Sequence, residues 1–100
     1  MGGEPLCPEN LGLTSLVISY VREKVPGVKI YIWTGYIYEN LLKNEASELK
    51  KILAQTDILI DGPYIEKLRD ITLSMRGSSN QRIIELKENK NEKNQSISFK

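Results

Sequence analysis

The segment Val28-Lys29-Ile30-Tyr31-Ile32-Trp33, followed by Thr34-Gly35, is the most β-prone part of the 100-residue chain. β-branched and aromatic residues of this kind favour an extended strand. Apolar side chains fall on both faces of that strand, so we expect it to be covered on both sides, as in a parallel sheet. A second apolar run, Ile58-Leu59-Ile60, ends at Asp61-Gly62-Pro63 and predicts a short neighbouring strand.

Two segments with helical periodicity lie before and after the first strand. Residues from about 10 to 25 have apolar side chains at helical spacing, with Asn10 as the expected N-cap and Pro26-Gly27 as the stop. The apolar residues of this first segment are Leu13, Leu16, Val17, Tyr20 and Val21. Tyr38 to about Gln55 predicts a second helix, with a buried stripe of Leu42, Ala46, Leu49 and Leu53. Helices that alternate with strands predict an α/β fold with parallel strands.

The last third of the chain has weaker signals. Residues 64–80 are expected to be irregular, with one helical turn near Ile65–Leu68, and Arg82–Leu86 is a candidate last strand. From Lys87 the chain is nearly all polar and is expected to be a disordered tail. We therefore expect one domain over residues 1–86 and a tail over residues 87–100.

Composition excludes several kinds of protein. The net charge of +1 gives no support for nucleic acid or an anionic membrane as partner, and no apolar run approaches a membrane span. The absence of histidine excludes a Ser-His-Asp triad and a histidine metal site. The single cysteine, Cys7, excludes a disulfide framework and is expected to pack as a small apolar residue rather than to bind metal. No signal peptide is present, so we expect a cytoplasmic protein.

Three polar segments are candidate ligand sites, each with a plainer alternative. Gly2 and Gly3 allow close backbone approach and Glu4 can accept hydrogen bonds from an ammonium group, although a flexible terminus is the alternative. Thr34 and Asp61 follow the two expected strands, at the sheet edge where α/β proteins bind ligands; two ordinary turns are the alternative.

The third segment has two arginines, which can clamp carboxylates or phosphates, around a turn rich in Ser and Asn; the alternative is a solvated loop. The candidate residues in it are Arg76, Ser78, Ser79, Asn80 and Arg82.

In this order, the segments resemble the activating proteins of anaerobic ribonucleoside-triphosphate reductase, in the radical S-adenosylmethionine (SAM) superfamily. The likeness covers about residues 2–86. It is carried by Gly2-Gly3-Glu4-Pro5-Leu6, Ile32-Trp33-Thr34-Gly35-Tyr36, Ile58–Ile65 and Arg76–Arg82. The resemblance implies the C-terminal part of a parallel partial (β/α) barrel of the radical SAM type, with its first strands missing.

The resemblance also implies a chemistry. A [4Fe–4S] cluster held by three cysteines binds and cleaves SAM, and the resulting radical creates a glycyl radical on the partner reductase. Gly2, Gly3 and Glu4 look like the loop that receives the SAM amine, and Thr34 and Asp61 look like strand-end residues near SAM. The segment from Arg76 to Arg82 looks like part of the site or of the partner surface.

The chain departs from this family at the cluster. The family motif Cys-x3-Cys-x2-Cys lies before the Gly-Gly-Glu segment, whereas Cys7 lies after it. We therefore expect a truncated chain that holds no cluster and is inactive alone, or else a non-catalytic α/β module that docks on the reductase. A sheet edge left open by missing strands predicts self-association through strand pairing.

Overall fold

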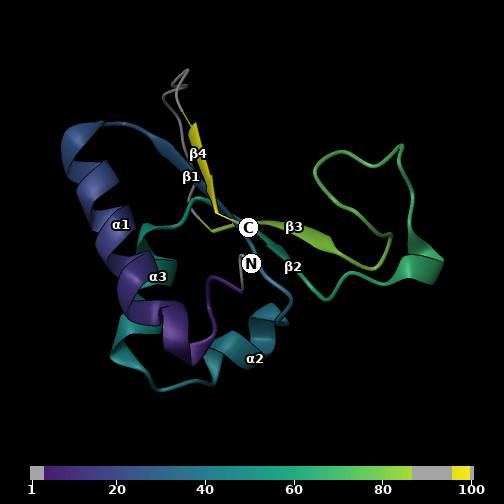
Figure 1. Ribbon diagram of the computed structural model, residues 1–100, viewed down its shortest axis with the longest axis horizontal. Helices are drawn as coiled ribbons and strands as arrows, with labels where there is room; N and C mark the ends of the chain where they lie inside the picture. The colour runs from purple at the N-terminus through teal and green to yellow at the C-terminus, as the bar shows by residue number, and fades with distance from the viewer. Residues whose placement is uncertain (1–3, 87–95, 100) are drawn as a thin grey trace.

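The computed structural model describes residues 4–86 and 96–99, and it is a mixed α/β fold with a four-stranded sheet in the order β3-β2-β1-β4 (Figure 1). The helices gather on one side of the sheet, and the loop between β2 and β3 extends away from them. In chain order, the elements are η1 (Pro8–Asn10), α1 (Leu11–Lys24), β1 (Lys29–Trp33), α2 (Tyr38–Leu42), α3 (Ser47–Gln55), β2 (Ile58–Asp61), η2 (Glu66–Leu68), β3 (Arg82–Glu85) and β4 (Ser96–Phe99).

The two central strands are parallel, as the sequence predicts. β1 and β2 pair with Tyr31 opposite Ile58 and Trp33 opposite Ile60. α2 and α3 form the crossover between them, which a parallel pair requires.

β3 corrects the expectation of a wholly parallel sheet. It runs antiparallel to β2, with Asp61 opposite Arg82. The segment from Gly62 to Gln81 forms only the short η2 helix and no crossover helix, so the chain re-enters the sheet at the end where β2 leaves it. The structure therefore supports an α/β fold without itself establishing a radical SAM barrel.

The core lies between the sheet and the helices. Ile30, Ile32 and Leu59 are fully buried against Ile18 of α1 and Ile52 of α3. All four residues of β2 are buried, but β1 alternates between half-buried and buried residues. The expectation that the first strand is covered on both faces is therefore wrong, because its second face receives no helix within the described residues.

The predicted helix from Tyr38 to Gln55 is instead two helices. Asn44 accepts a hydrogen bond through Oδ1 from the Ala46 backbone N–H at 2.8 Å, and this local turn replaces helical hydrogen bonds. The break shifts the helical phase, so that Leu41 is buried and Leu42 is 57% exposed, against the predicted stripe.

The buried face of α1 also differs from the apolar pattern in the sequence. Its buried residues are Thr14, Ser15, Ile18 and Val21. Thr14 can be buried because its hydroxyl donates to the Pro5 carbonyl at 2.8 Å. Leu13, Leu16 and Tyr20 lie on the exposed face of the helix.

The predicted disordered tail is corrected for four residues. Ser96–Phe99 form β4, which pairs in parallel with β1 from Lys29 to Ile32. Strand pairing satisfies backbone groups whatever the side-chain composition, which the composition argument did not consider. The rest of that predicted tail, residues 87–95 and 100, lies outside the described residues. The outer edge of β1 is therefore paired rather than open.

Arg22 and Asp57 form an ion pair that links α1 to the sheet, at the end of the sheet opposite the candidate site. Arg22 donates to Asp57 Oδ2 at 2.9 Å and to the Val28 carbonyl at 2.8 Å, and it also contacts the Gln55 carbonyl. Asp57 Oδ2 accepts a further hydrogen bond from the Ile30 N–H at 2.7 Å. In the part of the chain that the structure describes, no helix is long and apolar enough to cross a bilayer.

Candidate functional site

The carboxyl end of β1 holds the carboxylate of Glu4. Glu4 Oε2 accepts hydrogen bonds from the Thr34 hydroxyl at 2.5 Å and from the Leu6 N–H at 3.1 Å. Glu4 Oε1 accepts from the Gly35 N–H at 2.6 Å. Two candidate residues that are far apart in the sequence, Glu4 and Thr34, therefore meet at this edge. Gly2 and Gly3 lie outside the described residues.

Gly35 lies close to the Glu4 carboxylate. A Cβ on Gly35 would lie 3.4 Å from Glu4 Oε1, at the lower limit of ordinary van der Waals contact. Thr34 Oγ1 also accepts a hydrogen bond from the Tyr36 N–H at 3.2 Å, so the hydroxyl is fixed from two sides. Desolvation, followed by the nearby carboxylate of Glu4, raises the pKa of the Tyr36 phenol.

Asp61 lies at the end of β2 with its side chain only 1% exposed. Its Oδ1 accepts from Arg82 Nε at 3.0 Å, and its Oδ2 accepts from Arg82 Nη2 at 2.5 Å and from the Tyr38 N–H at 2.8 Å. Burial alone raises the pKa of Asp61, but the hydrogen bonds from Arg82 and Tyr38 outweigh it and lower the pKa. Asp61 therefore fixes the start of α2 and the position of Arg82.

Arg82 reaches beyond Asp61 to the surface. Its guanidinium also donates to both carboxylate oxygens of Glu39, at 2.7 and 3.3 Å. The hydrogen bond from Arg82 lowers the pKa of Glu39, and the two carboxylates together raise the pKa of Arg82. This link between α2 and β3 joins two residues that the sequence did not suggest as partners.

The candidate segment from Arg76 to Arg82 folds onto the turn that follows β2. The Ser78 hydroxyl donates to Asn80 Oδ1 at 2.6 Å, and Asn80 Nδ2 donates to the Pro63 carbonyl at 2.8 Å. The Ser79 N–H donates to the Leu68 carbonyl at 2.9 Å. The turn that follows β2 and the segment from Arg76 to Arg82 therefore form one hydrogen-bonded loop system.

Gln81 is the centre of that loop system, although it was not among the candidate site residues. Its Oε1 accepts from the Gly77 N–H at 2.8 Å and from the Ser78 N–H at 3.2 Å. Its Nε2 donates to the Gly62 carbonyl at 2.9 Å. In the sequence, the position of Gln81 among Ser, Asn and Gly residues indicated this role. A buried amide side chain commonly forms the hydrogen bonds that the backbone groups of a loop need.

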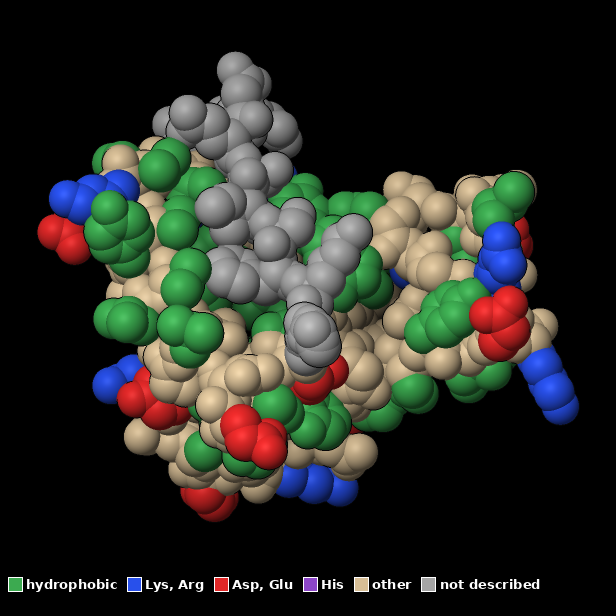
Figure 2. Space-filling model, viewed as in Figure 1, with side chains coloured by type: hydrophobic (Ala, Val, Ile, Leu, Met, Phe, Trp, Pro, Cys, Tyr) green, Lys and Arg blue, Asp and Glu red, His purple; other side chains and the backbone are tan. Residues whose placement is uncertain are grey.

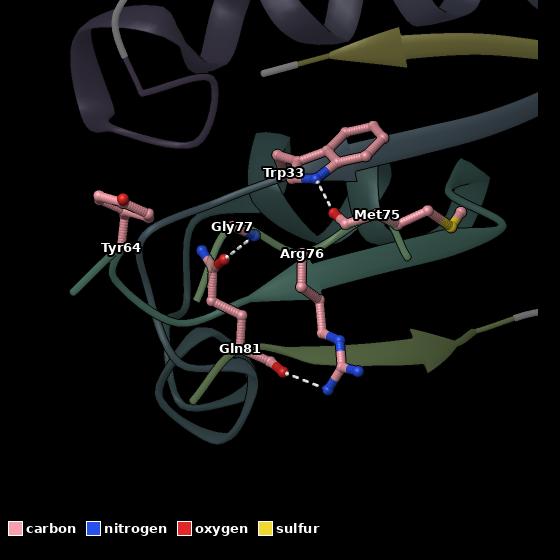
Figure 3. A pocket seen from close by; sticks show the side chains of 6 residues that line it. All are labelled: Trp33, Tyr64, Met75, Arg76, Gly77 and Gln81. Atoms are coloured by element: carbon pink, nitrogen blue, oxygen red, sulfur yellow. Dashed lines mark hydrogen bonds between the residues drawn. The ribbon is translucent and has the colours of Figure 1, made fainter. Parts of the chain in front are cut away.

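An open cavity of about 450 Å³ lies between this loop and the end of β1 (Figure 3). Trp33 Nε1 donates to the Met75 carbonyl at 2.6 Å, and Met75 has a positive φ of 68°. Arg76 Nη1 donates to the Gln81 carbonyl at 3.2 Å. The lining residues are Trp33, Tyr64, Met75, Arg76, Gly77 and Gln81. The cavity therefore adjoins the strand end that carries Thr34.

The fold and the site define a mixed α/β protein whose polar side chains gather at the carboxyl end of two parallel strands. The chain belongs to the family described as the 4Fe-4S single cluster domain, whose family model matches residues 1–84.

Curated relatives make the likeness more specific. The chain is 35% identical over 80 residues to the anaerobic ribonucleoside-triphosphate reductase-activating protein of Escherichia coli K12, covering 80% of this chain and 49% of that protein. It is 38% identical over 82 residues to the protein of the same name from Enterobacteria phage T4, covering 82% and 48%. The protein of this name from Haemophilus influenzae is 38% identical over 80 residues, covering 80% and 49%.

These matches confirm the resemblance stated from the sequence, and the chain spans about half the length of the curated relatives it matches. No solved structure matches the chain significantly.

The residues of this chain do not fit the cluster that the family description implies. A [4Fe–4S] cluster is held by several converging cysteine thiolates. The chain has one cysteine, and Cys7 is half-buried on the N-terminal loop. Among the described residues, no three His, Cys, Asp or Glu side chains converge on a point that can hold a metal ion.

Proposed function

We propose that the chain takes part in activating an anaerobic ribonucleoside-triphosphate reductase in the cytoplasm. In this proposal, it forms one side of a SAM site, and the [4Fe–4S] cluster is held by cysteines that these 100 residues do not contain. The chain alone is then inactive in glycyl-radical formation. The observation that carries the proposal is the meeting of Glu4 with Thr34 and Gly35 at the carboxyl end of β1.

The Glu4 carboxylate has acceptor capacity left for a ligand. A carboxylate offers about four lone-pair positions, and Glu4 accepts three hydrogen bonds from its own chain. Among the described residues, Oε1 accepts a hydrogen bond from Gly35 alone, and it is therefore the oxygen that we propose to face the ligand. An ammonium group, such as the amine of SAM, donates up to three hydrogen bonds and matches such a position.

Thr34 and Asp61 act in this proposal by positioning other groups. Thr34 holds Glu4 from the strand end, whereas Asp61 is buried and already accepts three hydrogen bonds. Asp61 therefore orders α2 and Arg82 beside the site rather than contacting SAM.

Calorimetric titration of the chain with SAM tests the proposal. We expect weak binding, because contacts to a cluster are missing, and a loss of affinity of at least tenfold in Glu4→Gln. Glu9→Gln is the matched control on the same N-terminal loop and should bind as the parent does. No binding at millimolar SAM, or equal binding by both variants, would contradict the proposal.

A second candidate function is a docking module without a cofactor. The loop between β2 and β3 exposes large apolar side chains: Tyr64 at 50%, Ile65 at 38%, Leu68 at 41% and Ile71 at 84%. Contiguous exposed apolar side chains are typical of protein interfaces. Binding to an immobilised anaerobic reductase should weaken in Ile71→Asp but not in Leu42→Asp, which alters an exposed leucine of α2. Binding without SAM, together with failure of the SAM titration, would favour this second function.

A further inference from the structure

Arg76 lines the open cavity of about 450 Å³ beside the end of β1, and most of its hydrogen-bonding capacity is unused. Among the described residues, its guanidinium forms one hydrogen bond, from Nη1 to the Gln81 carbonyl at 3.2 Å, and no ion pair. Arginine has five N–H donors, and Nε is buried here without a partner in the described part of the chain. A buried donor without a partner costs stability, so the contacts of the fold alone do not account for this arginine.

The carboxylates near Arg76 leave its charge available. Two hydrogen bonds from Thr72, and then the charge of Arg76, lower the pKa of Asp70, but within residues 4–86 Asp70 and Arg76 form no ion pair. Glu66, on the same loop, is paired with Arg69 at 3.6 Å. The residues that line the cavity carry a single charge, that of Arg76, so the cavity favours an anionic ligand.

Two aromatic side chains line the same cavity (Figure 3). Trp33 donates through Nε1 to the Met75 carbonyl at 2.6 Å, and its ring stacks with that of Tyr31 at a distance of 6.2 Å between the ring centres. Tyr64 comes from the loop after β2, and its hydroxyl donates to Glu66 Oε1 at 3.0 Å. Both rings are therefore held by other contacts. Aromatic rings of this kind are the groups on which planar nucleobases stack.

Gly77 allows the ring of Tyr64 to lie against the loop. A Cβ on Gly77 would lie 2.9 Å from Tyr64 Cδ1 and 3.0 Å from Tyr64 Cε1, closer than a real Cβ normally approaches. Figure 3 shows Gly77 between Tyr64 and Trp33. A larger residue at position 77 would displace Tyr64, so the shape of the cavity depends on this glycine.

The cavity has the size and setting of a small-molecule site. Its volume lies in the range of about 300–1,000 Å³ that is typical of such sites. Figure 2 shows that the loop between β2 and β3 projects from the molecule and carries hydrophobic side chains beside acidic and basic ones. Since the net charge of the chain is only +1, an anion is attracted here by the local arginine rather than by the whole surface.

We propose that this cavity binds a mononucleotide, with its base against Trp33 and Tyr64 and its phosphate on the guanidinium of Arg76. A phosphate accepts parallel hydrogen bonds from the planar fork of an arginine, and a base stacks on aromatic rings. This site is independent of the proposed function, because it uses Arg76 and a phosphate, whereas the SAM site uses Glu4 and an amine. SAM carries no phosphate, so the dependence of binding on a phosphate separates the two ligands.

Titration of the whole chain with adenosine monophosphate, followed by tryptophan fluorescence, tests the proposal. Trp33 is the only tryptophan of the sequence, so the signal comes from the cavity itself. We expect a saturable change with a dissociation constant of about 0.1–1 mM. Adenosine, which lacks the phosphate, and ribose phosphate, which lacks the base, should each bind at least tenfold more weakly. No saturable change at millimolar adenosine monophosphate overturns the proposal, as does either fragment binding as tightly as the nucleotide.

Charge variants of the loop test the role of Arg76. Arg76→Gln should weaken nucleotide binding at least tenfold, and Arg76→Lys should fall between this variant and the parent, because lysine keeps the charge without the fork. Lys67→Gln is the matched control, since it removes a cation from the same loop that does not line the cavity, and it should bind as the parent does. Equal losses in Arg76→Gln and Lys67→Gln, or no loss in either, overturn the proposal.

Asp70→Asn gives a test that misfolding cannot imitate. Asparagine keeps the Oδ1 acceptor for the two hydrogen bonds from Thr72, at 3.0 and 2.6 Å, and removes the carboxylate that competes with the ligand for Arg76. We expect this variant to bind adenosine monophosphate at least twofold more tightly than the parent. Circular dichroism confirms that each variant is folded. Weaker binding by a folded Asp70→Asn variant overturns the proposal.

Discussion

The hydroxyl of Thr34 donates a hydrogen bond of 2.5 Å to the carboxylate of Glu4, a residue 30 positions earlier in the chain. Thr34 is 4% exposed and the hydrogen bond itself is partly buried, so this contact closes the N-terminal loop over the end of β1. The same carboxylate is the group that we propose to face a ligand ammonium. This one contact therefore contributes both to the stability of the fold and to the proposed ligand site. Mutation of Thr34 tests the first contribution, and mutation of Glu4 tests the second.

Thr34→Val removes this donor while keeping the shape of the side chain. We expect the free energy of unfolding to fall by about 1–3 kcal/mol, because Glu4 loses a partner at a partly buried contact. Urea denaturation followed by circular dichroism measures the loss. Thr34→Ser keeps the hydroxyl but loses the methyl group, and it should lose clearly less stability than Thr34→Val. A Thr34→Val variant as stable as the parent would contradict a contribution from this hydrogen bond.

Arg82 lies between a buried and an exposed carboxylate, which allows a paired test. Asp61→Asn should lower the free energy of unfolding by about 2–4 kcal/mol, because the buried end of the ion pair loses its charge. Glu39→Gln, at the exposed end, should have a much smaller effect, since surface ion pairs are weak. Thermal unfolding of both variants measures the difference, and a larger effect of Glu39→Gln would show that Asp61 is not the main partner.

The acid stability of the chain should depend on Asp61. The pKa of its folded carboxyl lies below the ordinary value of 3.8, so near that pH the unfolded state binds more protons than the folded state. Its contribution is therefore complete above about pH 5 and is lost as the pH falls through 3.8 towards the lowered pKa. Asp61→Asn should flatten the fall of stability in this range. Glu39 and Asp70, whose pKa values are also lowered, should leave a residual slope.

Two glycines should respond to alanine in opposite directions. Gly12 lies within α1, and outside the adjacent residues and backbone of the helix no described heavy atom lies within 4 Å of the position of an added Cβ. Gly12→Ala should therefore stabilise the chain by about 0.5–1 kcal/mol through helix propensity. Gly62 has a φ of 101°, and Gly62→Ala should destabilise by about 1–2 kcal/mol. Chemical denaturation at low protein concentration measures both, and a destabilising Gly12→Ala would contradict the open surface at that position.

Periodicity and strand propensity predicted the elements that depend on local sequence. The first helix, both parallel strands and the turn near Leu68 lie where the pattern placed them. The break between α2 and α3 was missed because it depends on a hydrogen bond that the Ala46 N–H donates to the Asn44 side chain. The direction of β3 was missed because it depends on how the loop after β2 folds, which no local pattern encodes.

The sequence predicted where the site lies better than what its residues contact. Glu4 and Thr34 were both candidates, but their direct contact depends on a loop docking over the strand end. Asp61 was a candidate ligand, and only the structure shows that Arg82 and Tyr38 occupy its oxygens. Arg22 and Asp57 gave no signal at all, because ion pairs between distant residues follow from the tertiary fold.

The chain is similar to about half of the reductase-activating proteins but lacks the cysteines to hold the cluster that the family description implies. Anaerobic reconstitution of the chain with iron and sulfide, followed by iron analysis and visible absorbance, tests this claim most directly. A relative that carries Cys-x3-Cys-x2-Cys, reconstituted in parallel, controls for the procedure. We expect no stoichiometric iron and no charge-transfer absorbance in this chain. A stable [4Fe–4S] cluster, lost in Cys7→Ser, would contradict it.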